Sequence, residues 1–246
     1  SVTQLINSPR ILSLEQQHWA ELQEDCSDRL WAMFGSAVHS ILDDKSEASE
    51  QRFEADIGGW KLIGRLDRFK NGVIEDYKVT SAWSFLFGKP EWEQQLNIYA
   101  YLAELNAKPV AGLRVWAILR DWSAREWERS NNYPPSPIQH QVIPLWSKAK
   151  AHEFILERLA AHEKALDTLP ECTDIQRWKK PDDWAIIQPN GARADKLCKS
   201  KSDAERLLQQ YPGRVIEHRK GKSVRCESYC RVAGVCVQWQ RERNPA

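Results

Sequence analysis

Three charged residues within residues 60–80 have the types and spacing that could hold a divalent metal ion and act on a phosphate ester. Asp67 precedes Asp76 by nine residues, and Lys78 follows Asp76 by two. Side chains alternate along a strand, so Asp76 and Lys78 would share one face. A hard cation held by carboxylates lowers the pKa of bound water. An ammonium group can orient that water or stabilise charge that develops on the phosphate.

The elements that must position these residues are two strands joined by Asn71-Gly72. This dipeptide between alternating apolar runs predicts a two-residue type I′ hairpin. With this turn Asp67 falls directly opposite Asp76, and Arg65 falls opposite Lys78. Opposed carboxylates have Cβ atoms about 5 Å apart and repel each other. The pattern therefore predicts a cation between the two carboxylates.

The alternative for these charges is an exposed strand with an ordinary salt bridge. Apolar residues flank the acids, among them Leu66 and Ile74, and they indicate strands in the middle of a sheet. Unpaired charge on such a strand is costly. We therefore favour the metal site.

These residues and others in order along the chain resemble a known family. Gly64-Arg-Leu-Asp67 and Asp76-Tyr-Lys78 resemble the core of the PD-(D/E)xK nuclease superfamily in its RecB-like branch. The G-x-x-x-H that ends at His39 and the Q-x-x-x-Y from Gln95 to Tyr99 follow the order of that branch. The opening T-x-L-I-x-S-P-R is similar too, with Ser8 where a cysteine often stands. The resemblance spans roughly residues 1–146.

The resemblance implies a role for each of these residues. His39, Asp67, Asp76 and the backbone carbonyl of Tyr77 would hold Mg²⁺, or Mn²⁺ as a substitute. Lys78 would act on the water or the phosphate. Gln95 and Tyr99 would position the water, the phosphate or Lys78. On pattern alone, a lone histidine beside an apolar helix face is more often a buried structural residue.

The predicted fold is α/β, with a restriction-endonuclease-like core. Helical periodicity covers residues 30–44, and residues 90–106 form a second helix with Pro90 in its first turn. The expected order is a helix, a three-strand meander, a helix and a strand within residues 1–170. Residues 171–246 are expected to form a small basic α+β appendage with paired strands around Asn190-Gly191.

Two further side-chain placements follow from the periodicity. The apolar residues of the first core helix fall on one face, which we expect to pack in the core; they are Trp31, Phe34, Val38, Ile41 and Leu42. A second tight hairpin at Gly58-Gly59 places Glu54 opposite Ile63. Glu54 would then be a further acid near the metal or a partner for Arg65.

The cysteines make a second constellation. Cys226, Cys230 and Cys236 resemble the C-terminal cysteines of iron–sulfur nucleases of this branch, such as AddB-type and CRISPR-adaptation nucleases. Ser8 occupies the place of their fourth, N-terminal cysteine, and Cys172 could serve instead. Four thiolates suit a [4Fe-4S] cluster or Zn²⁺. Free thiols are the alternative, and Cys26 and Cys198 are read as unliganded.

The charge is distributed unevenly although the net charge is only +1. From Arg177 to the end there are 16 Lys and Arg against 8 Asp and Glu, a charge of +8, and the remainder carries −7. A basic part suits a polyanion partner, although a solvated basic surface would look the same. The opening residues lack a signal-peptide pattern, and no apolar run spans a membrane, so a cytoplasmic protein without membrane association is expected.

Together these patterns predict a metal-dependent DNA nuclease. Exonuclease action on single- or double-stranded DNA ends is expected, in recombination, repair or phage DNA processing, with a recombination protein as a partner. A structure-specific or single-strand endonuclease is the alternative within the enzyme class. A DNA-binding module without catalysis is the alternative outside it. A purely structural iron–sulfur protein would leave the opposed aspartates unexplained.

Overall fold

The computed structural model describes every residue except 24, 44–48 and 245–246. Internal contacts divide the chain into two units, which are described separately. The first unit comprises Ser1–Pro9 and Gln23–Thr168, and the second comprises Arg10–Leu22 and Leu169–Ala246. Sequence reasoning placed the division at residue 170 and left Arg10–Leu22 with the N-terminal part. Across the described residues, no helix combines the length and apolar character needed to cross a membrane.

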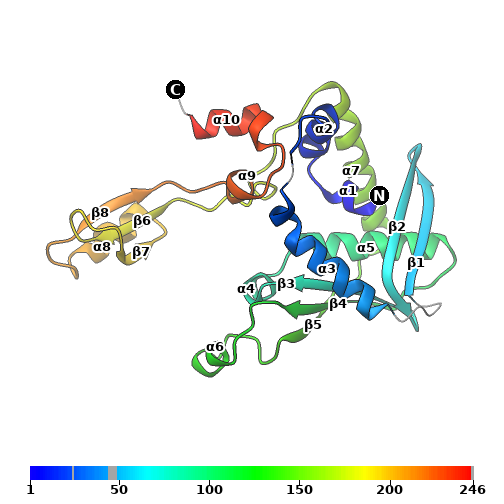
Figure 1. Ribbon diagram of the computed structural model, residues 1–246, viewed down its shortest axis with the longest axis horizontal. Helices are drawn as coiled ribbons and strands as arrows, with labels where there is room; N and C mark the ends of the chain where they lie inside the picture. Colours follow the sequence, from blue (N-terminus) through cyan, green and yellow to red (C-terminus); the bar gives the residue numbers. More distant parts are fainter. Residues whose placement is uncertain (24, 44–48, 245–246) are drawn as a thin grey trace. The chain divides into compact units, whose positions relative to one another are not determined.

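A five-stranded sheet runs through the first unit in the order β1-β2-β3-β4-β5 (Figure 1). The strands are β1 (Ser49–Ile57), β2 (Trp60–Lys70), β3 (Val73–Thr80), β4 (Gly112–Leu119) and β5 (Ile138–Ile143). All neighbours are antiparallel except β3 and β4, which are parallel. A parallel pair needs a long crossover, and α4 (Ala82–Phe87) and α5 (Pro90–Leu105) provide it.

The order of elements confirms the predicted α/β core. Helix α3 (Leu30–Leu42) precedes the meander β1-β2-β3, α5 follows it, and β4 comes next. The other helices of the first unit are α1 (Val2–Ile6), η1 (Cys26–Arg29), α6 (Ala124–Arg129) and α7 (Lys148–Asp167). Asp25 caps η1, and its carboxylate accepts a hydrogen bond from the Ser27 N–H.

The Asn71-Gly72 turn forms as predicted. Both residues have positive φ, 53° and 76°, as a type I′ turn requires, and Lys70 pairs with Val73. The β2–β3 pairing then ends at Arg68 and Glu75. The predicted direct pairing of Asp67 with Asp76, and of Arg65 with Lys78, is therefore wrong. The observed register would place these residues opposite each other, but the strand pairing ends at Arg68 and Glu75, one pair before the aspartates.

The Gly58-Gly59 hairpin also forms, and Glu54 pairs with Ile63 as expected. The Glu54 side chain, however, is exposed and pairs with Arg52 at 3.0 Å and Lys61 at 3.5 Å. Arg65 instead pairs with Glu50 at 3.1 Å. Both predicted roles of Glu54 are therefore wrong, because nearer cations occupy its carboxylate.

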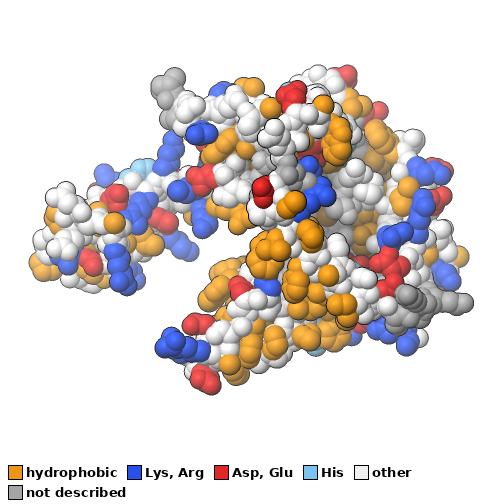
Figure 2. Space-filling view, in the orientation of Figure 1, with side chains coloured by type: hydrophobic (Ala, Val, Ile, Leu, Met, Phe, Trp, Pro, Cys, Tyr) orange, Lys and Arg blue, Asp and Glu red, His pale blue; other side chains and the backbone are white. Residues whose placement is uncertain are grey.

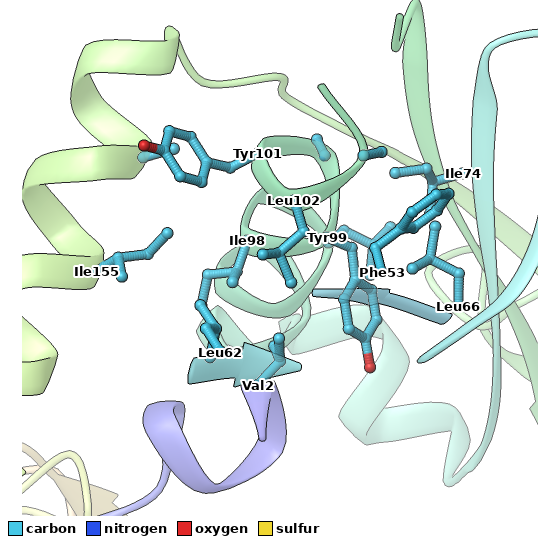
Figure 3. Packing of buried hydrophobic residues seen from close by; sticks show 14 of the residues in the cluster. Val2, Phe53, Leu62, Leu66, Ile74, Ile98, Tyr99, Tyr101, Leu102 and Ile155 are labelled. Carbon is cyan, nitrogen blue, oxygen red and sulfur yellow. The ribbon is translucent and has the colours of Figure 1, made fainter. Parts of the chain in front are cut away.

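Helix α5 supplies much of the core of the first unit. Figure 3 shows Ile98, Tyr99 and Leu102 of α5 directed toward Leu62, Leu66 and other core residues. Side chains of α1, β1, β3, β4 and α7 complete the cluster, among them Val2, Phe53, Ile74, Val115 and Ile155. Pro90 stands in the first turn of α5, as predicted, together with Glu91 and Glu93. Helix α5 is thus fixed firmly against the sheet.

Helix α3 does not pack as predicted. None of its residues is buried, and Trp31, Phe34 and Ile41 are 53%, 44% and 80% exposed. The helix contacts η1 and β3, which leaves most of its apolar face uncovered. The periodicity identified the face correctly, but α5 already fills the core that this face was expected to enter.

The second unit contains a small antiparallel sheet with strand order β7-β6-β8. Its strands are β6 (Asp183–Ile187), β7 (Ala194–Cys198) and β8 (Val215–Arg219), and α8 (Lys201–Leu208) packs on them. A separate apolar cluster joins Ile11 and Leu14 of α2 (Pro9–Gln17) to Cys172, Val232 and Cys236. The short helices α9 (Val224–Ser228), η2 (Ala233–Val235) and α10 (Val237–Arg243) complete this unit.

Candidate active site

The buried Asp76 and the half-buried Lys78 on β3 form the ion pair of the candidate site. The Lys78 Nζ lies 3.0 Å from Asp76 Oδ1 and 2.8 Å from Oδ2. Asp76 is only 3% exposed, and burial raises its pKa while the Lys78 ammonium opposes that rise. Two residues of separation on one strand are enough to produce this contact.

Asp67 on β2 joins the pair from the neighbouring strand. Its Oδ2 accepts a hydrogen bond of 2.7 Å from the Tyr77 N–H, and its Oδ1 lies 3.2 Å from His39 Nδ1. The hydrogen bond with Asp67 raises the pKa of His39, although partial burial opposes this rise. The carboxylate thus links β3 to α3 where the β2–β3 ladder has ended. The contact with Tyr77 is made by its N–H; the predicted role of its carbonyl remains a prediction.

Gln95 and Tyr99 stand one helical turn apart on α5, as their spacing requires. The Gln95 amide donates a hydrogen bond of 2.8 Å to the Tyr99 hydroxyl. Burial raises the pKa of the Tyr99 phenol, and the charges of Asp76 and Asp67 contribute to the rise. Tyr99 therefore stays a neutral hydroxyl within reach of the field of both aspartates. Thr3 also hydrogen bonds to it, a contact that sequence reasoning missed.

The donor set of this site fits a hard divalent ion. Among the described residues, no three His, Cys, Asp or Glu side chains are already arranged as the ligands of one metal ion. The Asp76 Oδ2 is fully buried and accepts no hydrogen bond from the described residues, although the Lys78 ammonium lies 2.8 Å away. A buried carboxylate oxygen with unused acceptor capacity, next to a second carboxylate and an imidazole, suits Mg²⁺ or Mn²⁺.

Glu75, next to Asp76 on β3, clamps three strands and was missed by sequence reasoning. Its carboxylate lies 2.9 Å from Arg68 Nη1 on β2 and 3.2 Å from Arg114 Nη1 on β4. It also accepts a hydrogen bond of 3.0 Å from the Trp116 indole. A register with Asp67 opposite Asp76 also places Arg68 opposite Glu75, and this was the available signal. These contacts tie β3 to both neighbouring strands at Glu75, the residue next to Asp76.

Gly64, the first residue of the Gly64-Arg-Leu-Asp67 motif, is in close contact with the Tyr99 ring. A Cβ at position 64 would lie 2.8 Å from Tyr99 Cδ1 and 3.0 Å from Leu102 Cδ1. We expect Gly64→Ala to lower the free energy of unfolding by about 1–3 kcal/mol, because overpacking displaces the ring. The same displacement should break the Gln95–Tyr99 hydrogen bond and lower activity. Chemical denaturation checks the first effect and a nuclease assay the second.

Gly35 on α3 provides the matched control for this substitution. Nothing lies within 4 Å of a Cβ built at Gly35, so Gly35→Ala should leave stability unchanged or raise it slightly. Equal stability of Gly64→Ala and Gly35→Ala would show that the Tyr99 packing does not restrict position 64.

The four predicted cysteine ligands line one cavity of the second unit: Cys172, Cys226, Cys230 and Cys236. Arg10 Nε lies 3.3 Å from the Cys236 sulfur in hydrogen-bond geometry. Burial raises the pKa of Cys226 to about 11, and the other three cysteines contribute. The described side chains are not already arranged around a single ion. The donor chemistry nevertheless suits a thiolate-bound metal, since a cation would offset the mutual repulsion of the sulfurs.

The remaining cysteines, Cys26 and Cys198, are not among the residues that line this cavity. Cys26 is exposed, and Cys198 packs with Ile186 and Ala204. Ser8 is buried and belongs to the first unit, whereas the cavity is lined by residues of the second.

Comparison with known proteins gives a family match and two distant structural similarities. A family model described as the PD-(D/E)XK nuclease superfamily matches residues 4–237. The crystal structure of SSO0001 is similar at 19% identity and a TM-score of 0.45, over 65% of this chain and 73% of that one. A "Putative exonuclease" from Eubacterium rectale is similar at 11% identity and a TM-score of 0.35, over 64% of this chain and 62% of that one. Among curated proteins, none matches this sequence.

Proposed function

Since the chain belongs to the PD-(D/E)XK nuclease superfamily, we propose that it is a divalent-metal-dependent deoxyribonuclease that acts as an exonuclease on DNA ends. The observation that carries the proposal is the ion pair between the buried Asp76 and Lys78, with the contact between Asp67 and His39 beside it. A structural salt bridge alone does not require a second carboxylate and an imidazole at the same place. Metal-assisted phosphodiester hydrolysis would give each of these groups a role.

The proposed metal ligands are Asp67, Asp76, His39 and the Tyr77 carbonyl, with Mg²⁺ as the ion and Mn²⁺ as its substitute. When bound, the ion supplies a water of lowered pKa and neutralises charge on the scissile phosphate. The Tyr77 N–H binds the Asp67 carboxylate, and the Lys78 ammonium binds the Asp76 carboxylate. Their positions are therefore largely set before the ion arrives.

Lys78 is the proposed catalytic cation. Its ammonium is held on Asp76, where it can donate a proton in a hydrogen bond to the attacking water or to a phosphate oxygen. Gln95 and Tyr99 are proposed to position Lys78, the water or the phosphate. Tyr99 can do so only as a hydrogen-bonding group, because its raised pKa keeps the phenol protonated at neutral pH.

Three other proposals concern partners, the cysteines and the biological role. The second unit, with its excess of Lys and Arg, is proposed to hold the DNA backbone. The four cysteines are proposed to bind a [4Fe-4S] cluster or Zn²⁺ as a structural centre. Recombination, repair or phage DNA processing is the proposed setting, with a recombination protein as partner.

The topology of the substrate tests the exonuclease assignment. We expect magnesium-dependent loss of end-labelled linear DNA, while covalently closed circles of the same sequence stay intact, because only the linear form offers ends. EDTA should stop the reaction. Cutting of closed circles would instead establish the endonuclease alternative. Binding of DNA without cleavage in Mg²⁺ and in Mn²⁺ would favour the non-catalytic module.

A further inference from the structure

The exposed apolar face of α3 contains an ordered pair of aromatic side chains. Trp31 and Phe34 meet edge to face with ring centroids 6.5 Å apart, and each is about half exposed. Figure 2 shows hydrophobic side chains gathered over this helix. Isolated apolar residues on a surface are ordinary, but contiguous groups mark binding sites. His39 on the same helix reaches Asp67, so this face adjoins the candidate active site.

A second aromatic group follows the catalytic strand directly. Helix α4 begins two residues after Thr80, the last residue of β3. Its Trp83 and Phe87 are 52% and 82% exposed, and their rings stack at 6.0 Å. The edge of Trp83 also meets the buried Tyr133 at 6.1 Å. The Trp83 ring is therefore held between Phe87 and Tyr133 while about half of its side chain stays exposed.

The support beneath α4 is built from hydrogen bonds and small side chains. Asp121 accepts a hydrogen bond of 2.7 Å from the Ala82 N–H, and its carbonyl accepts one of 3.2 Å from the Tyr133 hydroxyl. Ala82 is fully buried with Ala117 and Leu119. Aromatic rings that are held on a rigid support lose little conformational freedom when they stack on a ligand.

Two cations, Arg120 and Lys89, lie close to aromatic rings of the first unit. The Arg120 guanidinium lies 4.2 Å from the Trp31 ring centroid, and its backbone N–H donates to the Thr80 carbonyl at 2.9 Å. Burial lowers the pKa of Lys89, and the positive charges of Arg120 and Lys78 lower it further, against the effect of Glu91. The positive charges of Arg120 and Lys78 therefore both act on the Lys89 ammonium.

Lys89 and Arg120 are available to bind an anionic ligand. Across the described residues, neither Lys89 nor Arg120 forms an ion pair with a carboxylate; each has an aromatic ring as a neighbour instead. Phosphate groups would relieve the repulsion, and aromatic faces beside them suit bases. Bases of a duplex are already stacked inside the helix, so the combination selects an unpaired strand.

We propose that Trp31, Phe34, Trp83, Lys89 and Arg120 form a binding surface for single-stranded DNA next to the active site. Lys89 and Arg120 contact successive phosphates, and Trp31 and Trp83 stack on bases. This proposal rests on the proposed nuclease function and adds a substrate class to it. The enzyme would act on one strand, and duplex ends would have to be opened before cleavage.

The test measures binding in EDTA, so that its outcome does not depend on cleavage. The probe is a fluorescein-labelled oligothymidine strand, compared with a duplex of the same length, by anisotropy on the full chain. We expect Trp31→Ala to weaken single-strand binding about 5- to 150-fold, the range of one lost stacking partner, with little change for duplex. Trp31→Phe should restore most of the affinity.

Trp60→Ala provides the matched control, because Trp60 at the β1–β2 turn is 40% exposed and lies outside the proposed surface. Arg120→Ala should make the logarithm of the binding constant fall less steeply with the logarithm of salt concentration, by the amount of about one phosphate contact. The proposal is overturned if Trp31→Ala binds single strands as tightly as Trp60→Ala does. It is also overturned if the wild type is a dimer that Trp31→Ala converts to monomer with unchanged affinity for single strands. Failure of the nuclease function itself would show separately, as absence of cleavage in Mg²⁺ with binding intact.

Discussion

Lys78→Ala is expected to lower the rate of DNA cleavage about 10²- to 10³-fold at saturating Mg²⁺. Loss of one preorganised donor to developing negative charge has an effect of this size in other hydrolytic sites. The Lys78 ammonium lies 2.8 Å from a buried carboxylate oxygen, so it is fixed before substrate binds. No other described lysine or arginine forms an ion pair with Asp76. The measurement is single-turnover cleavage of end-labelled linear DNA.

Arg65→Ala is the control for the loss of a nearby positive charge. Arg65 lies on β2 two residues before Asp67, but it is exposed and pairs with Glu50. Its removal should leave the rate within a few-fold of wild type, since exposed ion pairs contribute little. Circular dichroism and single-strand binding in EDTA would establish that Lys78→Ala is folded. Full activity of folded Lys78→Ala would contradict the mechanism.

The active-site strands could be predicted because local rules determine them. Asn71-Gly72 specifies its turn through positive φ at both residues, and that turn determines the register from Lys70–Val73 to Arg68–Glu75. The spacing of Asp76 and Lys78 places them together on any strand. Sequence alone did not predict where the ladder ends, because that depends on how β2 and β3 diverge toward different neighbours.

Long-range packing explains the main errors. The apolar stripe of α3 obeys helical periodicity, but a stripe does not reveal what covers it, and α5 with its buried Ile98 and Leu102 fills the core. Glu54 was assigned correctly in register, yet its partners Arg52 and Lys61 were nearer than Arg65. Binary patterning identifies the faces of elements, whereas competition among neighbours decides which contacts form.

The cavity of the second unit shows how a distant segment can complete a site. Cys226, Cys230 and Cys236 lie close in sequence, whereas Cys172 precedes them by more than fifty residues. The Gln238 side-chain amide donates a hydrogen bond of 2.9 Å to the Cys172 carbonyl. Its amide oxygen accepts a hydrogen bond of 2.8 Å from the Cys172 N–H. This paired hydrogen bond holds the backbone of Cys172 beside α10. Cys172 is therefore placed at the cavity by the backbone, not by its thiol alone.

Cys172→Ser is accordingly expected to remove the proposed metal centre. Structural thiolate sites contribute about 10–16 kcal/mol of apparent binding free energy in small zinc domains, so loss of one of four ligands should lower metal content severely. Thermal unfolding of the variant should begin at lower temperature, because the folded state loses the stabilisation that metal binding provides. Metal and acid-labile sulfide per chain are measured after anaerobic purification. Iron with sulfide identifies a cluster, and zinc without sulfide identifies a zinc site.

Cys198→Ser separates this effect from the general cost of replacing a buried cysteine. Cys198 and Cys172 are both buried in the second unit, but Cys198 packs against Ile186 and Ala204, away from the cavity. It should retain the wild-type metal content, with at most a small change in stability. A wild-type chain that contains no metal, with four cavity thiols that react freely after unfolding, would leave the cysteines as packing residues. In that case the raised pKa of Cys226 would describe the resting state of the protein, a neutral thiol in an apolar cavity.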